Sequence, residues 1–225
     1  MKKSKRFNIL LTFFLSLLSF SSMAQDFDHE LLKIQQKWAV VNYNLEGDEQ
    51  EKAFEELNST VAQLVNTHPK KAESWVWQGI IQSSFAGAKG GLGALSYAKD
   101  AKASLEKAME IDALALDGSA YTSLGTLYHK VPGWPIGFGD DDKAKNYLEK
   151  ALALNPEGID PNYFYSEFLY DEREYSKAKQ YLELAQKAPS RVNRPLADQS
   201  RQLEIDQLMA KVAKKLKKKK KKKRR

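Results

Sequence analysis

The sequence predicts an all-α protein in which helical hairpins stack into a solenoid. Small and large apolar residues at helical spacing in segment 143–156 recur 34 residues later, in segment 177–189. A fixed period of that length is typical of repeated helix pairs. A third copy lies 43 residues upstream, in segment 101–111. The matched positions are Ala101, Leu105, Ala108 and Ile111; Ala144, Leu148, Ala151 and Leu154; and Ala178, Leu182, Ala185 and Ala188.

The segment 25–69 is predicted to form a degenerate helix pair at the N-terminal end of the solenoid. Its apolar residues recur every three or four positions, which places them on one helix face. Because this pattern departs from the repeat, we expect the pair to act as a cap. The residues concerned are Trp38 to Leu45 in the first helix and Ala53, Leu57, Val61 and Leu64 in the second, before Pro69.

Residues 70–190 are predicted to form three helix pairs. In each pair the second helix carries the repeated alanine and leucine positions, and the first carries large apolar residues around a small one. Gly79 and Gly125 are the small residues of the first two pairs, and they let helix backbones approach closely. Ser166 takes this place in the third pair, so the match is looser there.

Two insertions interrupt the repeats, and each joins the first helix of a pair to its second. The chain uses ten extra residues between 79 and 101, with several glycines, and seven between 128 and 144. Insertions at one equivalent point of successive repeats project from one rim of a solenoid. The glycines lack the G-x-x-x-x-G-K-[ST] pattern of a phosphate loop, so we expect them to end one helix and turn the chain.

Prolines and glycines in the second insertion predict a rigid loop that carries Trp134 and Phe138. These rings either pack beneath the loop or stack on a ligand, and we favour packing because compact loops are usually filled by their own side chains. Asp140, Asp141 and Asp142 follow directly. Calcium ligands alternate along a loop whereas these are consecutive, so we expect them to cap the next helix.

The C-terminal region divides into a capping helix over 191–213 and a polybasic tail over 214–225, predicted to be disordered because like charges repel. Removing the +4 of residues 1–24 and the +11 of the tail from the total of +7 leaves −8 on residues 25–213. Lys214 to Arg225 could contact an anionic membrane surface, fold back on the acidic body, or have no role. Nucleic acid is disfavoured, because no aromatic residue interrupts the run.

Residues 1–24 are predicted to be a secretory signal peptide. Four basic residues precede the apolar run from Ile9 to Phe20, and Ser22 and Ala24 occupy the positions that a signal peptidase reads. The chain has no cysteine, so neither a disulfide nor lipid attachment at a lipobox is available. We expect a periplasmic or secreted protein that is not a lipoprotein.

No catalytic or metal-binding constellation is found in the sequence. The histidines are isolated, and carboxylates lie beside lysines at spacings typical of solvated helix faces. We therefore expect no enzyme activity, no metal site and no cofactor.

Residues 70–190 resemble tetratricopeptide repeats, and residues 70–213 resemble the periplasmic T-component family of TRAP transporters. The second resemblance rests on the glycine-rich interruptions, the step Gly139 to Ala144, and a closing helix entered through Leu196, Ala197 and Asp198. It implies association with a solute-binding protein and passage of a small apolar ligand.

The tetratricopeptide resemblance implies a concave groove lined by the first helix of each pair. It lacks the lysine and asparagine set that clamps a peptide carboxylate in chaperone-binding relatives, which disfavours that ligand. We expect a periplasmic scaffold for a protein or peptide partner; the alternative is a transport accessory that binds a small apolar ligand. The implied groove residues are Val76, Ile80, Ser83, Thr122, Thr126, His129, Tyr163, Glu167 and Tyr170.

Overall fold

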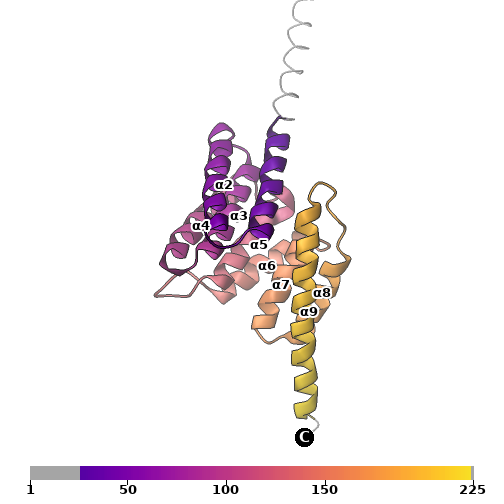
Figure 1. The fold of residues 1–225 in the computed structure, drawn as a ribbon. Coiled ribbons are helices and arrows are strands. Elements are labelled where there is room, and N and C mark those ends of the chain that lie inside the picture. Colours follow the sequence, from indigo (N-terminus) through magenta and orange to yellow (C-terminus); the bar gives the residue numbers. More distant parts are fainter. Residues whose placement is uncertain (1–25, 224–225) are drawn as a thin grey trace, which may run out of the picture.

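The computed structural model describes residues 26–223, and over this range the chain is a stack of α-helices (Figure 1). The predicted all-α solenoid of helical hairpins is confirmed. An N-terminal helix over residues 26–44 comes first. It is followed by α2 (Gly47–Thr67), α3 (Ala72–Lys89), α4 (Gly91–Asp112), α5 (Ala115–Lys130), α6 (Asp141–Leu154), α7 (Ile159–Asp171), α8 (Tyr175–Lys187) and α9 (Pro195–Lys223).

The three helix pairs within residues 70–190 are α3 with α4, α5 with α6, and α7 with α8, and each of these helices packs most extensively on its partner within the pair. The N-terminal helix and α2 precede them, as the predicted cap requires. Residues 1–24, the predicted signal peptide, lie outside the described residues. Among the helices that are described, none is both long and apolar enough to cross a membrane.

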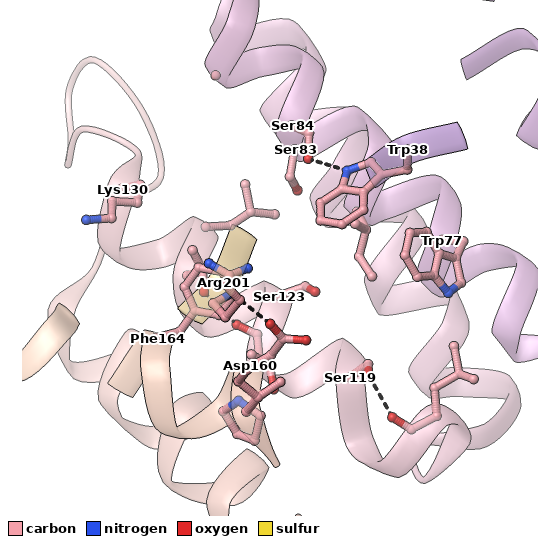
Figure 2. Close-up of a pocket in the computed structure, with 18 of the residues that line it drawn as sticks. Trp38, Trp77, Ser83, Ser84, Ser119, Ser123, Lys130, Asp160, Phe164 and Arg201 are labelled. Carbon is pink, nitrogen blue, oxygen red and sulfur yellow. Dashed lines mark hydrogen bonds and ion pairs between the residues drawn. The ribbon is translucent and has the colours of Figure 1, made fainter. Parts of the chain in front are cut away.

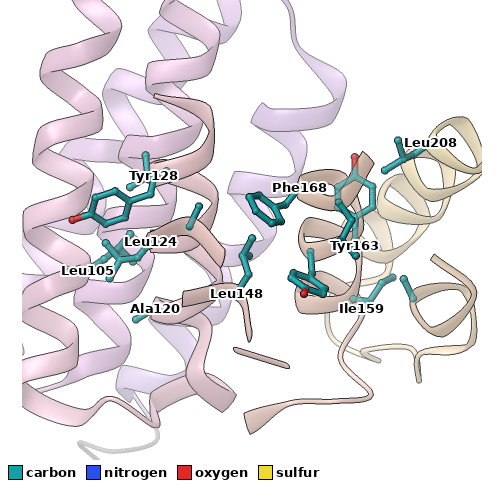
Figure 3. Close-up of a cluster of buried hydrophobic side chains, with 14 of the residues drawn as sticks. Leu105, Ala120, Leu124, Tyr128, Leu148, Ile159, Tyr163, Phe168 and Leu208 are labelled. Carbon is teal, nitrogen blue, oxygen red and sulfur yellow. The ribbon is translucent and has the colours of Figure 1, made fainter. Parts of the chain in front are cut away.

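In the first two pairs, a glycine on the first helix lies against a leucine of the second. These leucines, Leu105 and Leu148, belong to the buried cluster drawn in Figure 3. A Cβ atom at Gly125 would lie 2.6 Å from Leu148 Cγ, and one at Gly79 would lie 2.5 Å from Leu105 Cγ. Only glycine therefore allows these helices to pack as closely as they do. Ser166 is fully buried at the third position, and its hydroxyl donates to the backbone oxygen of Tyr163 at 2.6 Å.

The first insertion is not a projecting loop. Its extra residues lengthen α3 and α4, which meet at Gly90 and Gly91, both at positive φ (61° and 58°). The prediction that glycines end one helix and turn the chain is confirmed at these two positions. The second insertion is a loop over residues 131–140, as predicted.

Helix α9 packs against α8 and α7 and then continues through Lys223 (Figure 1). The sequence predicted a disordered tail from residue 214, whereas the described part of that tail is helical. Leu216 packs against the main core, and the Lys215 ammonium lies 5.9 Å from the Tyr170 ring centre. These contacts hold the first residues of the basic run against the body, and the high helix propensity of lysine favours continuation of the helix through Lys223.

The start of α9 joins the two ends of the solenoid. The apolar core divides into a larger cluster over α3 to α9 and a second cluster built on the N-terminal helix, α2 and α3. Ala197, in the first turn of α9, is 2% exposed and belongs to the second cluster. The C-terminal helix therefore contacts the N-terminal cap.

Candidate functional site

A cavity of about 1090 Å³ lies on the inner side of the stack (Figure 2). Its volume is at the upper end of the range typical of small-molecule sites. Figure 2 shows Trp38 and Trp77 on one side of it and Asp160, Phe164 and Arg201 on the other. Apolar wall residues include Ile80, Ala94, Leu95, Leu116, Leu127, Val131, Ile159 and Phe164.

The connection 188–194, between α8 and α9, closes part of this space. Gln36 of the N-terminal helix donates to the backbone oxygen of Asn193 at 3.1 Å. The guanidinium of Arg194 lies over the rings of Trp77 and Trp38, at 4.9 and 5.9 Å from their centres. A segment from one end of the solenoid thus contacts the other end and partly closes the groove. We call this partly closed cavity the chamber.

An ion-pair network holds the connection 188–194 to the wall. Asp160, at the start of α7, accepts from Arg191 at 2.7 Å and from Arg201 at 2.9 Å. Asp198 accepts from Arg191 Nε at 2.7 Å, and Arg201 also donates to Glu204 at 2.5 Å. Burial alone would raise the pKa of Asp160, but the arginines outweigh it and hold that pKa well below its usual range.

Arg194 differs from the other arginines of the wall, because no carboxylate within the described chain forms an ion pair with it. Its Nε is buried and has no hydrogen-bond partner among residues 26–223. Burial, and then the neighbouring Arg191, lower the pKa of Arg194 to about 10. The side chain therefore remains charged at neutral pH, and the face of Trp77 provides cation–π contact.

Four of the predicted groove residues line the cavity. Two of them carry hydroxyls that are already satisfied locally: Ser83 donates to Gly79 O at 2.8 Å and Thr126 to Thr122 O at 2.9 Å. Such bonds to the preceding helical turn leave the apolar parts of these side chains facing the cavity. The four residues are Ile80, Ser83, Thr122 and Thr126.

The other five predicted groove residues do not line the cavity. Val76 is fully buried in the main core, because α3 packs against α2, α4 and α5 on different faces. His129 lies 3.0 Å from Asp171 Oδ2 and 3.4 Å from Asp141 Oδ1, so it bridges α5 to α6 and α7. The prediction that it faces the groove is wrong.

In the third pair the predicted groove positions are also displaced from the cavity. Tyr163 is 8% exposed, and the Arg201 guanidinium lies 4.5 Å from its ring centre. Glu167 pairs with Lys130 at 3.2 Å, and the ring of Tyr170 packs against Tyr175 at 5.5 Å. Helix α9 covers this part of α7, and the cavity instead meets Asp160, Pro161 and Phe164.

The two loop aromatics behave differently from each other. Phe138 packs edge-on against Tyr128 at 5.5 Å, as the packed interpretation predicted. Trp134 is 90% exposed, so the same prediction is wrong for it; Ile136 beside it is also exposed and lies at the cavity. Asp140 accepts from the Lys143 amide at 3.0 Å, which confirms its role as a helix cap. No metal-binding cluster occurs within residues 26–223.

Sequence reasoning missed the residues that close the chamber, which are Trp38, Arg191, Arg194 and Arg201. One signal was available: a connection of seven residues between two helices carries two arginines and ends directly before Pro195. A short basic segment of this kind, next to an acidic solenoid body, could have been tested as a bridge across the groove.

Comparison with known proteins supports the repeat. A family model described as a tetratricopeptide repeat matches residues 136–191. Residues 136–191 are thus similar to a tetratricopeptide repeat. A solved structure titled "Functional Characterization of Pseudomonas Aeruginosa pilF" is 18% identical, covers 83% of this chain and 91% of that chain, and has a TM-score of 0.35. No curated protein matches.

The matched tetratricopeptide repeat spans α6, α7 and α8, where the sequence period was most regular. These matches give no support to the resemblance to TRAP T-components.

Proposed function

We propose that this protein is a periplasmic scaffold that holds an extended segment of a protein partner in its inner chamber. The observation that supports the proposal most directly is the cavity of about 1090 Å³ between the first helices of the repeats and the connection 188–194. A concave surface built from successive repeats is the usual binding face of a solenoid.

The shape of the chamber favours an extended segment over a folded partner. The connection 188–194 already contacts the N-terminal helix, so a globular domain could not enter without displacing it. Two apolar side chains, Ile136 and Val192, lie on the cavity and are 69% and 90% exposed. Exposed apolar groups at the rim of a pocket are typical of interaction surfaces.

A substitution that fills the chamber tests the proposal. Thr126→Trp places a large ring in the space, and Lys145→Trp, at an exposed position on α6 away from the cavity, is the control. Envelope extract passed over each mature protein should yield a partner that wild type and Lys145→Trp retain and Thr126→Trp loses. Equal retention by a folded Thr126→Trp variant would contradict binding in the chamber.

The alternative is a transport accessory that carries a small apolar ligand together with a solute-binding protein. The predominance of apolar side chains in a partly closed chamber favours this function. Native mass spectrometry of the purified protein, followed by extraction with organic solvent, would reveal a bound small molecule. A homogeneous ligand-free mass from protein purified under native conditions would contradict it.

Export is proposed from residues 1–24 alone. Cleavage after Ala24 would release the chain into the envelope. N-terminal sequencing of the native protein should begin at Gln25, and recovery of Met1 would refute the proposal.

Contact with an anionic membrane surface is proposed for the basic end of α9. The lysines at 217–221 are exposed on a helix that extends away from the body (Figure 1). Each basic residue near an anionic surface contributes about 1 kcal/mol. Deleting residues 217–225, which spares Leu216, should abolish salt-sensitive binding to phosphatidylglycerol vesicles; unchanged binding would exclude the tail as the contact.

A further inference from the structure

We propose that the occupant of the chamber carries a carboxylate on an apolar body, and that Arg194 binds this carboxylate. The inference rests on the proposed function, because it names the chemistry of whatever the chamber holds. It adds a recognition group that lies outside the repeats, on the connection 188–194.

The ion pairs of the cavity wall distinguish Arg194 from the other cationic side chains. Four cationic side chains line the cavity, and three of them are paired: Arg191 and Arg201 with Asp160, and Lys130 with Glu167. Arg194 alone among these four has no carboxylate partner within residues 26–223. Arg194 is therefore the one cation of this set that forms no ion pair within the described chain, although Asp160 and Asp198 lie close enough to oppose the lowering of its pKa.

The other acidic residues of the cavity form no ion pair with Arg194 in the described chain. Asp117 and Glu157 also line it, but both are exposed and neither forms an ion pair with Arg194 in the described chain. Asp198 forms its ion pair with Arg191, and Glu204 forms its ion pair with Arg201. A carboxylate on a molecule that enters the chamber would supply the acceptor that Arg194 Nε lacks among residues 26–223.

Neighbouring side chains hold the Arg194 guanidinium in a position where it can donate hydrogen bonds to a ligand. The guanidinium lies 4.9 Å from the ring centre of Trp77 and 5.9 Å from that of Trp38. Trp38 Nε1 donates to Ser84 Oγ at 2.9 Å, and Trp77 is buried, so both rings are held in place. A buried donor without a partner is destabilising, and more so if it is charged, so an acceptor for Arg194 Nε is favoured. A planar carboxylate matches the guanidinium fork with two parallel hydrogen bonds.

The rest of the wall suits an apolar body. Ile80, Leu116 and Phe164 face the same space, and the hydroxyls of Ser83, Ser119 and Thr126 are satisfied by their own helices. These hydroxyls do not require a polar ligand. A molecule that is anionic at one end and apolar elsewhere therefore complements the chamber.

Paired probes test the inference on the wild-type protein. Decanoate is compared with methyl decanoate, and the peptide acetyl-Leu-Leu-Phe with a free C-terminus is compared with its amide, all by calorimetry below the micelle concentration. Each carboxylate should bind about 10- to 100-fold more tightly than its neutral counterpart, the range expected for hydrogen bonds to a charged group. If only decanoate binds, the carboxylate comes from a small acid. If only the free peptide binds, it comes from the C-terminus of a chain. Binding of both would show that the chamber accepts either source.

A matched pair of variants assigns the effect to this residue. Arg194→Met keeps much of the side-chain bulk against the tryptophans but removes the charge and should abolish the difference between acid and neutral probe. Lys145→Gln removes an exposed charge on α6 and should leave the difference unchanged. The comparison on wild type needs no variant, so poor folding of Arg194→Met would not obscure the result.

Different experimental results would refute this inference and the proposed function. Equal binding of charged and neutral probes would overturn the role of Arg194 and leave a binding chamber intact. No binding of any probe would overturn the inference, while the envelope-extract comparison would still decide the proposed function.

Discussion

The contact between Gly125 and Leu148 provides a quantitative test of how the middle helix pair is packed. A Cβ atom at position 125 would lie 2.6 Å from Leu148 Cγ and 3.1 Å from the backbone oxygen of Ala144. Leu148 is 1% exposed, so its side chain has no open space into which it could move. Adding one methyl group at position 125 therefore forces a rearrangement of the core.

Two effects of Gly125→Ala oppose each other. Alanine is about 1 kcal/mol more favourable than glycine inside a helix, whereas overpacking a core costs about 1 to 3 kcal/mol. Because the contact distances are far below van der Waals separation, we expect a net loss of about 1 kcal/mol in the free energy of unfolding. Leu148→Ala should cost about 2 to 5 kcal/mol by leaving a cavity.

The double variant should reverse the sign of the first change. Leu148→Ala removes the two side-chain atoms nearest to the added methyl, so Gly125→Ala should stabilise the protein in that background. The coupling between the two sites should be about 1 to 3 kcal/mol, the size of the relieved overpacking.

Urea unfolding of residues 25–225, followed by circular dichroism, measures the four proteins of this cycle. Gly87→Ala in α3 is the control, because a Cβ there would meet nothing within 4 Å and should stabilise the helix. If Gly125→Ala raises the urea midpoint of the otherwise unchanged protein as Gly87→Ala does, the close packing deduced here is refuted.

Three further results are expected. Arg201 and Arg191 hold the pKa of Asp160 below its unfolded value despite burial, so its contribution is present above about pH 4 and lost as pH falls below that value. Asp160→Asn should cost roughly 3 kcal/mol at pH 7 and flatten the fall in urea midpoint between about pH 5 and pH 2; parallel profiles would contradict this. Tyr163→Ala should cost about 3 kcal/mol because the ring is buried beneath α9, and Tyr170→Ala less because it is half-buried; equal thermal melts would contradict the difference. Truncation after Ala213 should lower the melting temperature and truncation after Leu216 should not, because Leu216 packs on the core; identical melts would show that it contributes nothing.

The sequence alone determined the helix pairs and their internal packing. A period of 34 residues and a small residue opposite a repeated leucine are local signals, because each pair buries its own face first and its neighbour next. The structure places Gly125 against Leu148 and Gly79 against Leu105, in agreement with those signals. Four of the predicted groove residues, all on α3 and α5, line the cavity for the same reason, and their role in binding a partner stays a prediction.

The groove of the third pair could not be read from the repeat register. Asn162 is buried and donates to Pro156 O and Gly158 O, both at 2.8 Å, which ties the start of α7 to the preceding turn. Helix α9 then covers Tyr163, a residue that the register had placed in the open groove. The position of a capping helix depends on contacts that no repeat pattern contains.

Only the tertiary structure decided that the groove is a chamber. Arg194 reaches Trp38 and Trp77 because the rotations of the intervening helix pairs accumulate until the two ends of the solenoid meet. No local sequence pattern around Arg194, Trp38 or Trp77 predicts this accumulated rotation. The same long-range closure leaves Arg194 in the wall without a carboxylate partner from the described chain, and thereby defines the chemistry proposed for the site.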